Sequence, residues 1–224
     1  NNNGRVVSFE PSSNGSGSYS NATQLIGFTI QNGYANQAYP GSVGGAIFCV
    51  QADPILSNLR IINNTAYSEG PGIYSRFYSE PTIVNCFIEN NFGNGAAVMS
   101  VNEAKTTIIN SVISNNNTAE ALYVRHGSLE IINSVINNDS KDIHCLAADL
   151  IITNSIIGNL NNSQIDLDFG NLSITHSNLR GGQSIINEMS PSTINWGLGN
   201  IDVEPLFVDA ANGDYRLSNF SPCI

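Results

Sequence analysis

The sequence predicts an all-β solenoid, in which the chain winds through stacked coils of similar length. A short apolar stretch meets a turn residue seven times, and these turn residues are Gly27, Asn58, Asn85, Asn110, Asn133, Asn154 and His176. Successive turns lie 31, 27, 25, 23, 21 and 22 residues apart. A period in this range indicates stacked units that pack on their neighbours, rather than one folded-back globule.

Apolar and polar positions recur at fixed distances from each turn. Ile or Leu stands two residues before every turn and again three residues after it, and Asn stands five residues after all but the last turn. A further apolar column consists of Ile47, Ile73, Val98, Leu122, Ile143 and Ile165. Each coil is therefore expected to hold three short strands with alternating inward residues. Asn and Gly suit the turns because they adopt positive φ at low cost, and stacked Asn side chains are expected to form a hydrogen-bonded ladder.

Other repeat architectures do not fit this pattern. Helical periods are absent and β-branched residues dominate the apolar set. The turn-to-turn distance is too short for a βαβ unit or a propeller blade, and the Leu and Asn spacing of a leucine-rich repeat is missing. A parallel β-helix of roughly seven to eight coils remains.

Several segments resemble bacterial secreted proteins with right-handed β-helix repeats, the pectate-lyase-like superfamily. They are "LIGFTIQNG", "GGAIFC", "PTIVNCFIENN" and "GNIDVEPLFVDAANGDYRLSNFSPCI", and the last looks like the C-terminal closing motif of that group. The resemblance implies right-handed coils and an exported bacterial protein that is extracellular or at the cell surface. It implies no single activity, because the fold carries lyases, hydrolases, epimerases, adhesins and binding modules.

A single β-helix domain is expected over residues 1–224. Residues 1–22 contain part of a first coil and a loop at 12–22, residues 23–180 contain the repeats, and residues 181–224 form a closing segment. The chain begins inside a coil and shows no signal peptide, so we expect a fragment of a longer protein with neighbouring domains.

Composition narrows the classes of partner. Charged residues make up 12% of the chain and the net charge is −10, which argues against nucleic acid as a ligand. No apolar run is long enough to insert into a membrane. Cys49 and Cys145 share an inward column four coils apart, too far for a disulfide, and Cys86 lies in a column of serines. All are expected to be buried free thiols.

The strand that contains Ile47 and its equivalents is predicted to carry the functional face. Two columns of this strand point outward if alternation holds. The first is Phe48, Tyr74, Met99, Tyr123, His144 and Asp166, and the second is Val50, Arg76, Val101, Arg125, Leu146 and Asp168. Phe48, Tyr74, Arg76, Tyr123 and Arg125 are the predicted ligand-binding residues, because rings and guanidinium groups at about 10 Å spacing can engage successive sugars.

Acidic residues dominate the other half of this face. Asp142, Asp166 and Asp168 are candidate ligands for Ca²⁺, a hard cation that prefers carboxylate oxygens. Arg125, His144 and Asp166 come from three successive coils and are the candidate acid/base residues. The "RHG" at residues 125–127 resembles part of the polygalacturonase signature, but the paired Asp clusters that accompany it are missing.

These observations favour a non-catalytic, extracellular polysaccharide-binding or adhesive module of a bacterial surface protein. The alternative is a polysaccharide lyase or glycoside hydrolase that acts on uronate-containing polysaccharide through the same face. Strand propensity alone can also place Tyr and Arg outward. The long loop at residues 33–46 is expected either to wall a groove near Phe48 and Tyr74 or to pack over an exposed end. A second stripe, Phe87, Val112, Val135 and Ile156, is expected either to tuck inward or to form an apolar patch for a partner.

Overall fold

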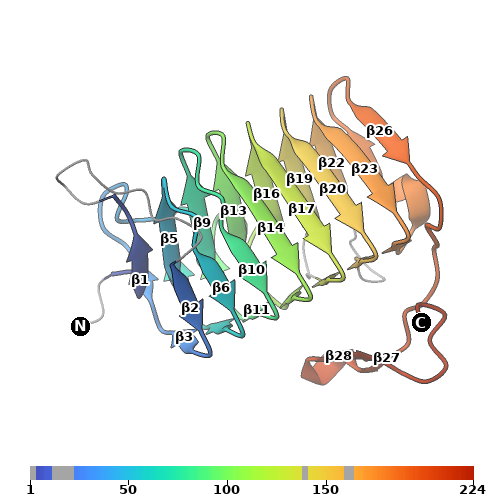
Figure 1. The fold of residues 1–224 in the computed structure, drawn as a ribbon, viewed down its shortest axis with the longest axis horizontal. Coiled ribbons are helices and arrows are strands. Elements are labelled where there is room, and N and C mark those ends of the chain that lie inside the picture. The colour runs from blue at the N-terminus through green and yellow to red at the C-terminus, as the bar shows by residue number, and fades with distance from the viewer. Residues whose placement is uncertain (1–3, 12–22, 138–140, 159–163) are drawn as a thin grey trace.

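The computed structural model describes residues 4–11, 23–137, 141–158 and 164–224, which form a parallel β-solenoid (Figure 1). Its first sheet contains β1 (Val7–Phe9), β5 (Ile47–Val50), β9 (Ile73–Arg76), β13 (Val98–Val101), β16 (Glu120–Arg125), β19 (Lys141–Leu146), β22 (Ile165–Asp168) and β25 (Ile186–Glu188). Its second sheet contains β2 (Gln24–Ile26), β6 (Ile55–Ser57), β10 (Thr82–Val84), β14 (Lys105–Ile109), β17 (Ser128–Ile132), β20 (Asp149–Thr153), β23 (Asn171–Thr175) and β26 (Thr193–Trp196).

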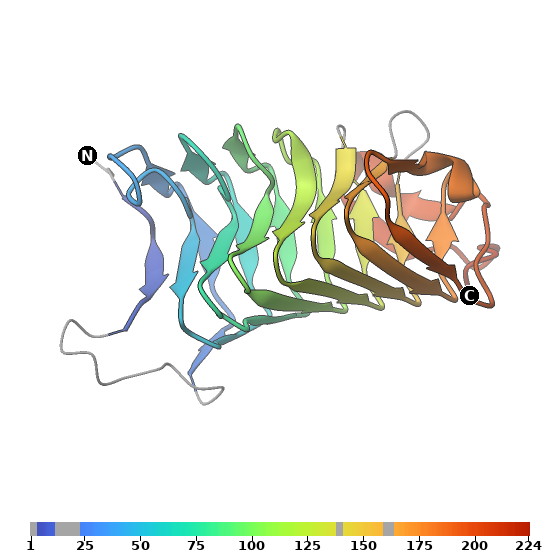
Figure 2. The same ribbon diagram turned by 90° about the horizontal axis from the view of Figure 1, so that it is seen from above.

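Two further parallel sheets form the remaining sides of the solenoid. The third sheet contains β3 (Thr29–Gln31), β7 (Arg60–Ile62), β11 (Phe87–Glu89), β15 (Val112–Ser114), β18 (Val135–Asn137), β21 (Ile156–Ile157) and β24 (Asn178–Leu179). A short fourth sheet contains β4 (Tyr34–Ala35), β8 (Thr65–Ala66) and β12 (Phe92–Gly93). Strands of one sheet are separated in sequence by a whole coil, so every sheet grows by one strand per turn of the chain (Figure 2).

The solenoid makes about six complete turns, slightly fewer than the seven to eight expected. Six coils from β5 to β24 each contribute one strand to all three long sheets. The first coil is interrupted by residues 12–22, where a loop was expected and which lie outside the described residues. The last coil contributes β25 and β26 alone. Within the described ranges helical structure is limited to the 3₁₀ turns η1 (Gly182–Ile185) and η2 (Ala210–Asn212), and no helix there is long and apolar enough to cross a membrane.

The inward columns predicted from sequence form one continuous core. Ile108 pairs with Ile83 on one side and Ile131 on the other, and all three side chains are fully buried. Because the strands are parallel and in register, each core residue packs on its own equivalents above and below. The stack therefore repeats one layer of aliphatic side chains along its length.

The Asn and Gly turns have the expected backbone conformation. From Asn58 to His176 the turn residues have φ between 48° and 53°, and Gly27 has φ 78°. The turns between the first and second sheets have the same conformation, but their sequence gives no sign of it. They place φ near 50° on Gln51, Phe77, Asn102, His126, Ala147 and Phe169. Packing of the coil thus imposes the left-handed conformation even on residues such as Phe77 and Ala147, which do not favour it.

The expected bond between stacked turn asparagines occurs where Asn154 Nδ2 donates to Asn133 Oδ1 over 2.7 Å, while a buried asparagine ladder lies one residue beyond the Asn63 and Asn90 column. The backbone N–H of Asn64 donates to Asn91 Oδ1 over 3.0 Å, and that of Asn91 donates to Asn116 Oδ1 over 3.0 Å. The predicted column, which includes Asn63 and Asn90, supplies the left-handed turn residues instead, with φ 55° and 56°. The left-handed residue bends the chain at the end of the third sheet. The side chain of the next residue therefore points into the interior, where it bonds buried backbone groups.

The cysteine environment agrees with the sequence prediction. Cys49, Cys86 and Cys145 are buried, and all four thiols, including Cys223, are free. Burial raises the pKa of Cys49 and of Cys145 to about 12. Cys86 is the first residue of a hydrogen-bonded ladder. In it, each backbone N–H donates over 3.1 Å to the hydroxyl of the serine one coil further on, and the serines are Ser111, Ser134, Ser155 and Ser177.

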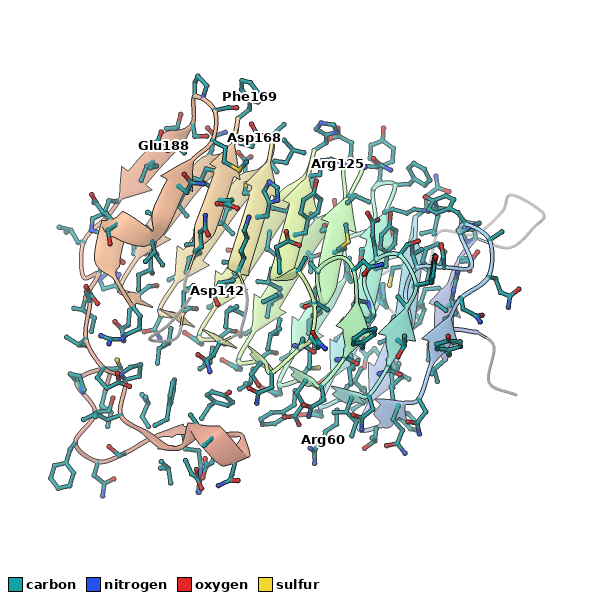
Figure 3. The ribbon with its side chains drawn as sticks, turned by 180° about the vertical axis from the view of Figure 1, so that it is seen from behind. Arg60, Arg125, Asp142, Asp168, Phe169 and Glu188 are labelled. Atoms are coloured by element: carbon teal, nitrogen blue, oxygen red, sulfur yellow. The ribbon has the colours of Figure 1, made fainter. Side chains whose placement is uncertain are left out.

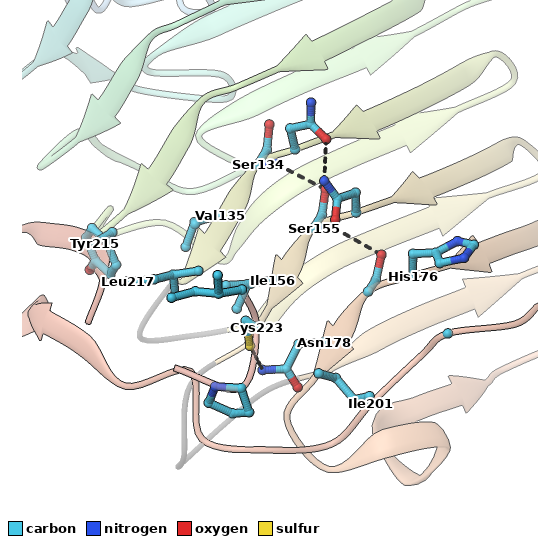
Figure 4. Close-up of a pocket in the computed structure, with 16 residues that line it drawn as sticks. Ser134, Val135, Ser155, Ile156, His176, Asn178, Ile201, Tyr215, Leu217 and Cys223 are labelled. Carbon is cyan, nitrogen blue, oxygen red and sulfur yellow. Dashed lines mark hydrogen bonds between the residues drawn. The ribbon is translucent and has the colours of Figure 1, made fainter. Parts of the chain in front are cut away.

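The C-terminal segment folds back along the third sheet (Figure 1). Its hairpin, β27 (Phe207–Asp209) with β28 (Asp214–Leu217), is held where Asn137 Nδ2 donates to the Tyr215 hydroxyl over 3.1 Å. Val135 and Ile156 point outward and line a pocket of about 560 Å³ beneath this segment (Figure 4). The expectation that their stripe tucks inward is wrong, because strict alternation puts Ile113 and Ile136 inside.

Substituting the core residue Ile131 by Asp should abolish the cooperative thermal transition. An unpaired carboxylate in this column costs several kcal/mol and disturbs the coils on both sides. Ile132→Asp, one residue on and partly exposed on the opposite face, is the matched control and should melt closer to wild type. Circular dichroism decides the assignment, and equal melting of both variants would contradict it.

The asparagine ladder should carry more stability than surface asparagines do. Asn91→Ala removes the Oδ1 acceptor of Asn64 N–H and the Nδ2 donor to the Ile61 carbonyl. Leaving these buried groups unpaired should lower the free energy of unfolding by about 3 kcal/mol. Chemical denaturation measures the loss, with exposed Asn94→Ala as control. A loss no larger than that of the control would argue against a structural ladder.

Candidate functional site on the first sheet

The structure aligns both predicted outward columns in register. Phe48 pairs with Tyr74, and Tyr123 pairs with Met99 and His144. The second column follows in the same strands, so Arg125 pairs with Val101 and Leu146. Alignment alone does not make these residues equivalent, because the two halves of the face have different surroundings.

The N-terminal half of the face is sealed by the long loop. Val43 of that loop packs on Phe48, Tyr74 and Met99 in a second apolar cluster outside the sheet. Phe48 has no exposed surface and Tyr74 is 3% exposed, while their stacked rings have centroids 5.9 Å apart. Burial raises the pKa of the Tyr74 phenol. The loop thus covers these two rings and does not wall an open groove beside them.

Two arginines fasten the loop to the sheet. The Arg5 guanidinium lies 3.8 Å from the centroid of the Phe48 ring and donates a hydrogen bond to the Pro40 carbonyl. Arg76 donates to the Tyr39 hydroxyl and lies 5.2 Å from the Phe48 centroid. Cation–π contacts of this kind stabilise desolvated rings. Three predicted ligand residues, Phe48, Tyr74 and Arg76, are therefore occupied by contacts within the chain.

The C-terminal half of the face remains accessible around Tyr123, Arg125 and His144. The Tyr123 and His144 rings meet edge to face with centroids 5.0 Å apart, and His144 Nδ1 lies 3.9 Å from Glu120 Oε1. Burial raises the pKa of the Tyr123 phenol; Arg125 opposes this rise, and Glu69, Glu120 and Asp168 add to it. The tyrosine hydroxyl thus lies among more carboxylates than cations.

Three buried polar atoms at this site lack a hydrogen-bond partner in the described parts of the chain. They are Arg125 Nε, His144 Nε2 and Asp168 Oδ1. Buried polar atoms are nearly always paired, so such a group indicates a place where a ligand or ordered solvent completes the bonding. The three atoms supply both donors and an acceptor.

The Asp166 carboxylate is bonded by residues of the chain itself. Its buried carboxylate accepts hydrogen bonds from Lys141 Nζ over 2.6 Å, Gln164 Nε2 over 2.5 Å and Asn187 Nδ2 over 2.9 Å. Burial alone would raise its pKa, but the hydrogen bonds from Lys141, Asn187 and Gln164 outweigh burial and hold the pKa of Asp166 below its usual value. Asp166 lies one strand from His144, yet its oxygens bond to other residues.

The candidate calcium ligands do not form one cluster. Asp142 lies near the start of β19, whereas Asp168 is the last residue of the neighbouring strand β22, so the two lie at opposite ends of their strands (Figure 3). Within residues 4–11, 23–137, 141–158 and 164–224, no three His, Cys, Asp or Glu side chains are grouped so that they could hold a metal ion. Asp166 meets its bonding needs with three protein donors.

A groove borders Arg125 and Asp168 where the chain turns from the first sheet to the second. Its volume is about 490 Å³, and its lining comes from four successive coils. The lining residues are Glu103, Lys105, His126, Gly127, Ser128, Ala147, Ala148, Asp149, Phe169 and Asn171. A Cβ atom at Gly127 would lie 2.0 Å from the Ala104 carbonyl oxygen, so only glycine fits this floor.

Phe169 rises at one end of this groove. Its ring is 62% exposed and its backbone is left-handed, with φ 52°. Arg125, Asp168 and Phe169 follow the same edge of the solenoid in Figure 3. The repeat pattern does not reveal this groove, and its sequence signal is limited to small residues, Gly127, Ala147 and Ala148, at successive turns.

Comparison with known proteins identifies the repeat class. A family model described as right handed beta helix region matches residues 9–136, more than half of the chain. The chain belongs to this right-handed β-helix family. No curated protein and no solved structure matches it. Because β-helices support many activities, the function of this β-helix must be argued from its own surface.

The Lys141–Asp166 pair should make the stability of the β-helix depend on pH. The pKa of Asp166 is lower in the folded chain than in the unfolded chain, where it is about 4. The stabilisation is therefore present above about pH 4 and is lost as the pH falls through the lower folded value.

Asp166→Asn should accordingly lower the melting temperature at neutral pH, and the difference from wild type should shrink in acid. Thermal melts across this range test the linkage, with the exposed Asp149→Asn as a surface control. A difference that stays constant from neutral to acid pH would show that the ionised carboxylate is not what stabilises the fold.

Proposed function

We propose that this β-helix is an extracellular polysaccharide-binding module. A glycan segment lies over Tyr123, Arg125 and His144 and continues into the groove beside Phe169. The observation that carries the proposal is the set of unpartnered buried atoms Arg125 Nε, His144 Nε2 and Asp168 Oδ1 on the first sheet. Arg125 and Asp168 directly precede His126 and Phe169, which line the groove. Sugar hydroxyls both donate and accept hydrogen bonds, so one ligand class can pair all three atoms.

The charge around the site favours a neutral glycan over a polyuronate. Glu69, Glu120 and Asp168 act on the Tyr123 phenol, and Glu103 and Asp149 line the groove. Of the cations, Lys105 is paired with Glu80 over 3.0 Å. Like charges at short range disfavour binding, and the net charge of −10 adds to this effect.

Phe169 supports the proposal through its position. An exposed aromatic ring at the end of a polar groove provides a stacking surface for the apolar face of a pyranose. Small residues on the groove floor keep the path open between Phe169 and Glu103.

A second candidate function is glycan cleavage at the same face. His144 favours it, because Nε2 is unpartnered while Nδ1 lies 3.9 Å from Glu120 Oε1, an arrangement that suits general acid or base catalysis. Incubation with neutral and uronate polysaccharides, followed by assays for new reducing ends and for unsaturated sugar, tests this candidate. Activity lost in His144→Ala would favour it over binding alone.

Binding can be measured by affinity electrophoresis and calorimetry against xylan, mannan, β-glucan, pectate and alginate. Neutral polysaccharides should bind, and added salt should change their affinity little. Arg125→Ala and Phe169→Asn should each weaken binding by about 5- to 30-fold, the loss expected for one good contact. Asn tolerates the left-handed turn, so Phe169→Asn removes the ring with little strain.

Phe220→Ala is the matched control, because this ring is exposed but lies outside the groove. Its affinity and the melting temperatures of all three variants should stay close to wild type. The proposal fails if the intact protein binds none of the polysaccharides, or if neither Arg125→Ala nor Phe169→Asn weakens binding.

A further inference from the structure

The short fourth sheet presents a second set of exposed rings. Tyr34 of β4, Thr65 of β8 and Phe92 of β12 pair in register, and their neighbours Ala35 and Ala66 face the interior. Tyr34 is 44% exposed and Phe92 is 56% exposed, so both rings project outward. In each coil this sheet follows the third sheet and precedes the first, so the first sheet separates it from the groove at Phe169.

A third ring lies on the middle coil of this surface. Tyr67 directly follows β8, and its side chain is 72% exposed. Its backbone is fixed from both neighbouring coils: its N–H donates to the Ala35 carbonyl over 2.8 Å, and its carbonyl accepts from Asn94 Nδ2 over 3.1 Å. We call Tyr34, Thr65, Tyr67, Phe92 and Asn94 the short-sheet face.

The spacing of the rings is set by the strands. Tyr34 and Phe92 are two strands apart, which corresponds to about 9 to 10 Å, with the small Thr65 between them. Two successive pyranose units of an extended chain span such a separation. The three rings keep between 44% and 72% of their surface exposed, so core packing alone does not account for them.

The chemistry of the short-sheet face points to one kind of occupant. None of its five side chains is charged, whereas aromatic rings, a hydroxyl and a carboxamide alternate across it. Rings stack on the C–H faces of sugars, and amides and hydroxyls bond their hydroxyl groups. Strands of two residues offer too little area for a stable protein interface, which needs about 800 Å² from each partner.

The geometry points to the short-sheet face as a second saccharide-binding site, which takes a neutral, extended polysaccharide. It shares no residue with the groove and does not depend on it. Two sites on separate sides of one rigid stack would bind a polymer with avidity, because the first contact raises the effective concentration at the second. The rigid sheet also holds the rings in place before binding, which lowers the entropic cost.

The test uses the full chain in two backgrounds, with soluble β-glucan, mannan and xylan as probes. In the groove-disabled background, Arg125→Ala with Phe169→Asn, polysaccharide binding should persist but weaken. Adding Tyr34→Ala and Phe92→Ala should then reduce affinity by about 10-fold or more, since two stacking contacts are lost. In the same background Tyr67→Phe keeps the ring and should leave affinity unchanged, whereas Tyr67→Ala should weaken binding.

Phe28→Ala is the control, because Phe28 is equally exposed but lies outside the fourth sheet. Melting temperatures should not change, so lost binding cannot be ascribed to unfolding. If Tyr34→Ala with Phe92→Ala binds like its parent in both backgrounds, the short-sheet face is not a saccharide site, and the groove proposal stands. If the groove variants bind like wild type while the face variants bind nothing, the groove proposal fails and the face remains. A wild-type protein that binds no polysaccharide overturns both.

Discussion

In-register hydrogen bonding between successive coils is the constraint on which the rest of this structure depends. Ile108 lies between Ile83 and Ile131, and Tyr123 lies between Met99 and His144, because each strand pairs with the next at a fixed offset of one coil. A slip of one residue would exchange the inner and outer faces of a strand. The buried ladders of Asn91 and Ser134 reinforce the register, since each bonds a backbone N–H of the preceding coil.

With the register fixed, the surroundings of each outward residue decide its role. Tyr74 and Tyr123 occupy equivalent positions two strands apart, yet one lies beneath the 33–46 loop and the other borders an open site. Arg76 and Arg125 differ in the same way. Both keep an unpartnered Nε, but Arg76 also donates to Tyr39 of the loop, whereas Arg125 lies beside a groove that the loop does not cover. Equivalent side chains therefore serve stability at one end of the sheet and are available for binding at the other.

The sequence was sufficient to predict the features that follow from the repeat, such as which residues point into the core. Alternation predicted the buried positions of Ile108 and Ile131 and the free thiol of Cys145, because these follow from local pattern and strand spacing. It could not predict the covering of Phe48, since that depends on how a loop and Arg5 pack from distant parts of the chain. The three hydrogen bonds to Asp166 likewise come from residues in different coils. The asparagine ladder was displaced by one residue because the pattern does not reveal which Asn adopts the left-handed turn.

Alternation also divides the residues of each strand into an inward set and an outward set, which are nearly independent of each other. Inward residues such as Ile131 specify the stack, and outward neighbours such as Glu130 and Ile132 meet different surroundings. Changes at distant outward positions should combine additively, because they share no packing partner. The surface of such a protein can thus diverge one coil at a time while its interior is conserved, and a new ligand preference can arise without a new fold.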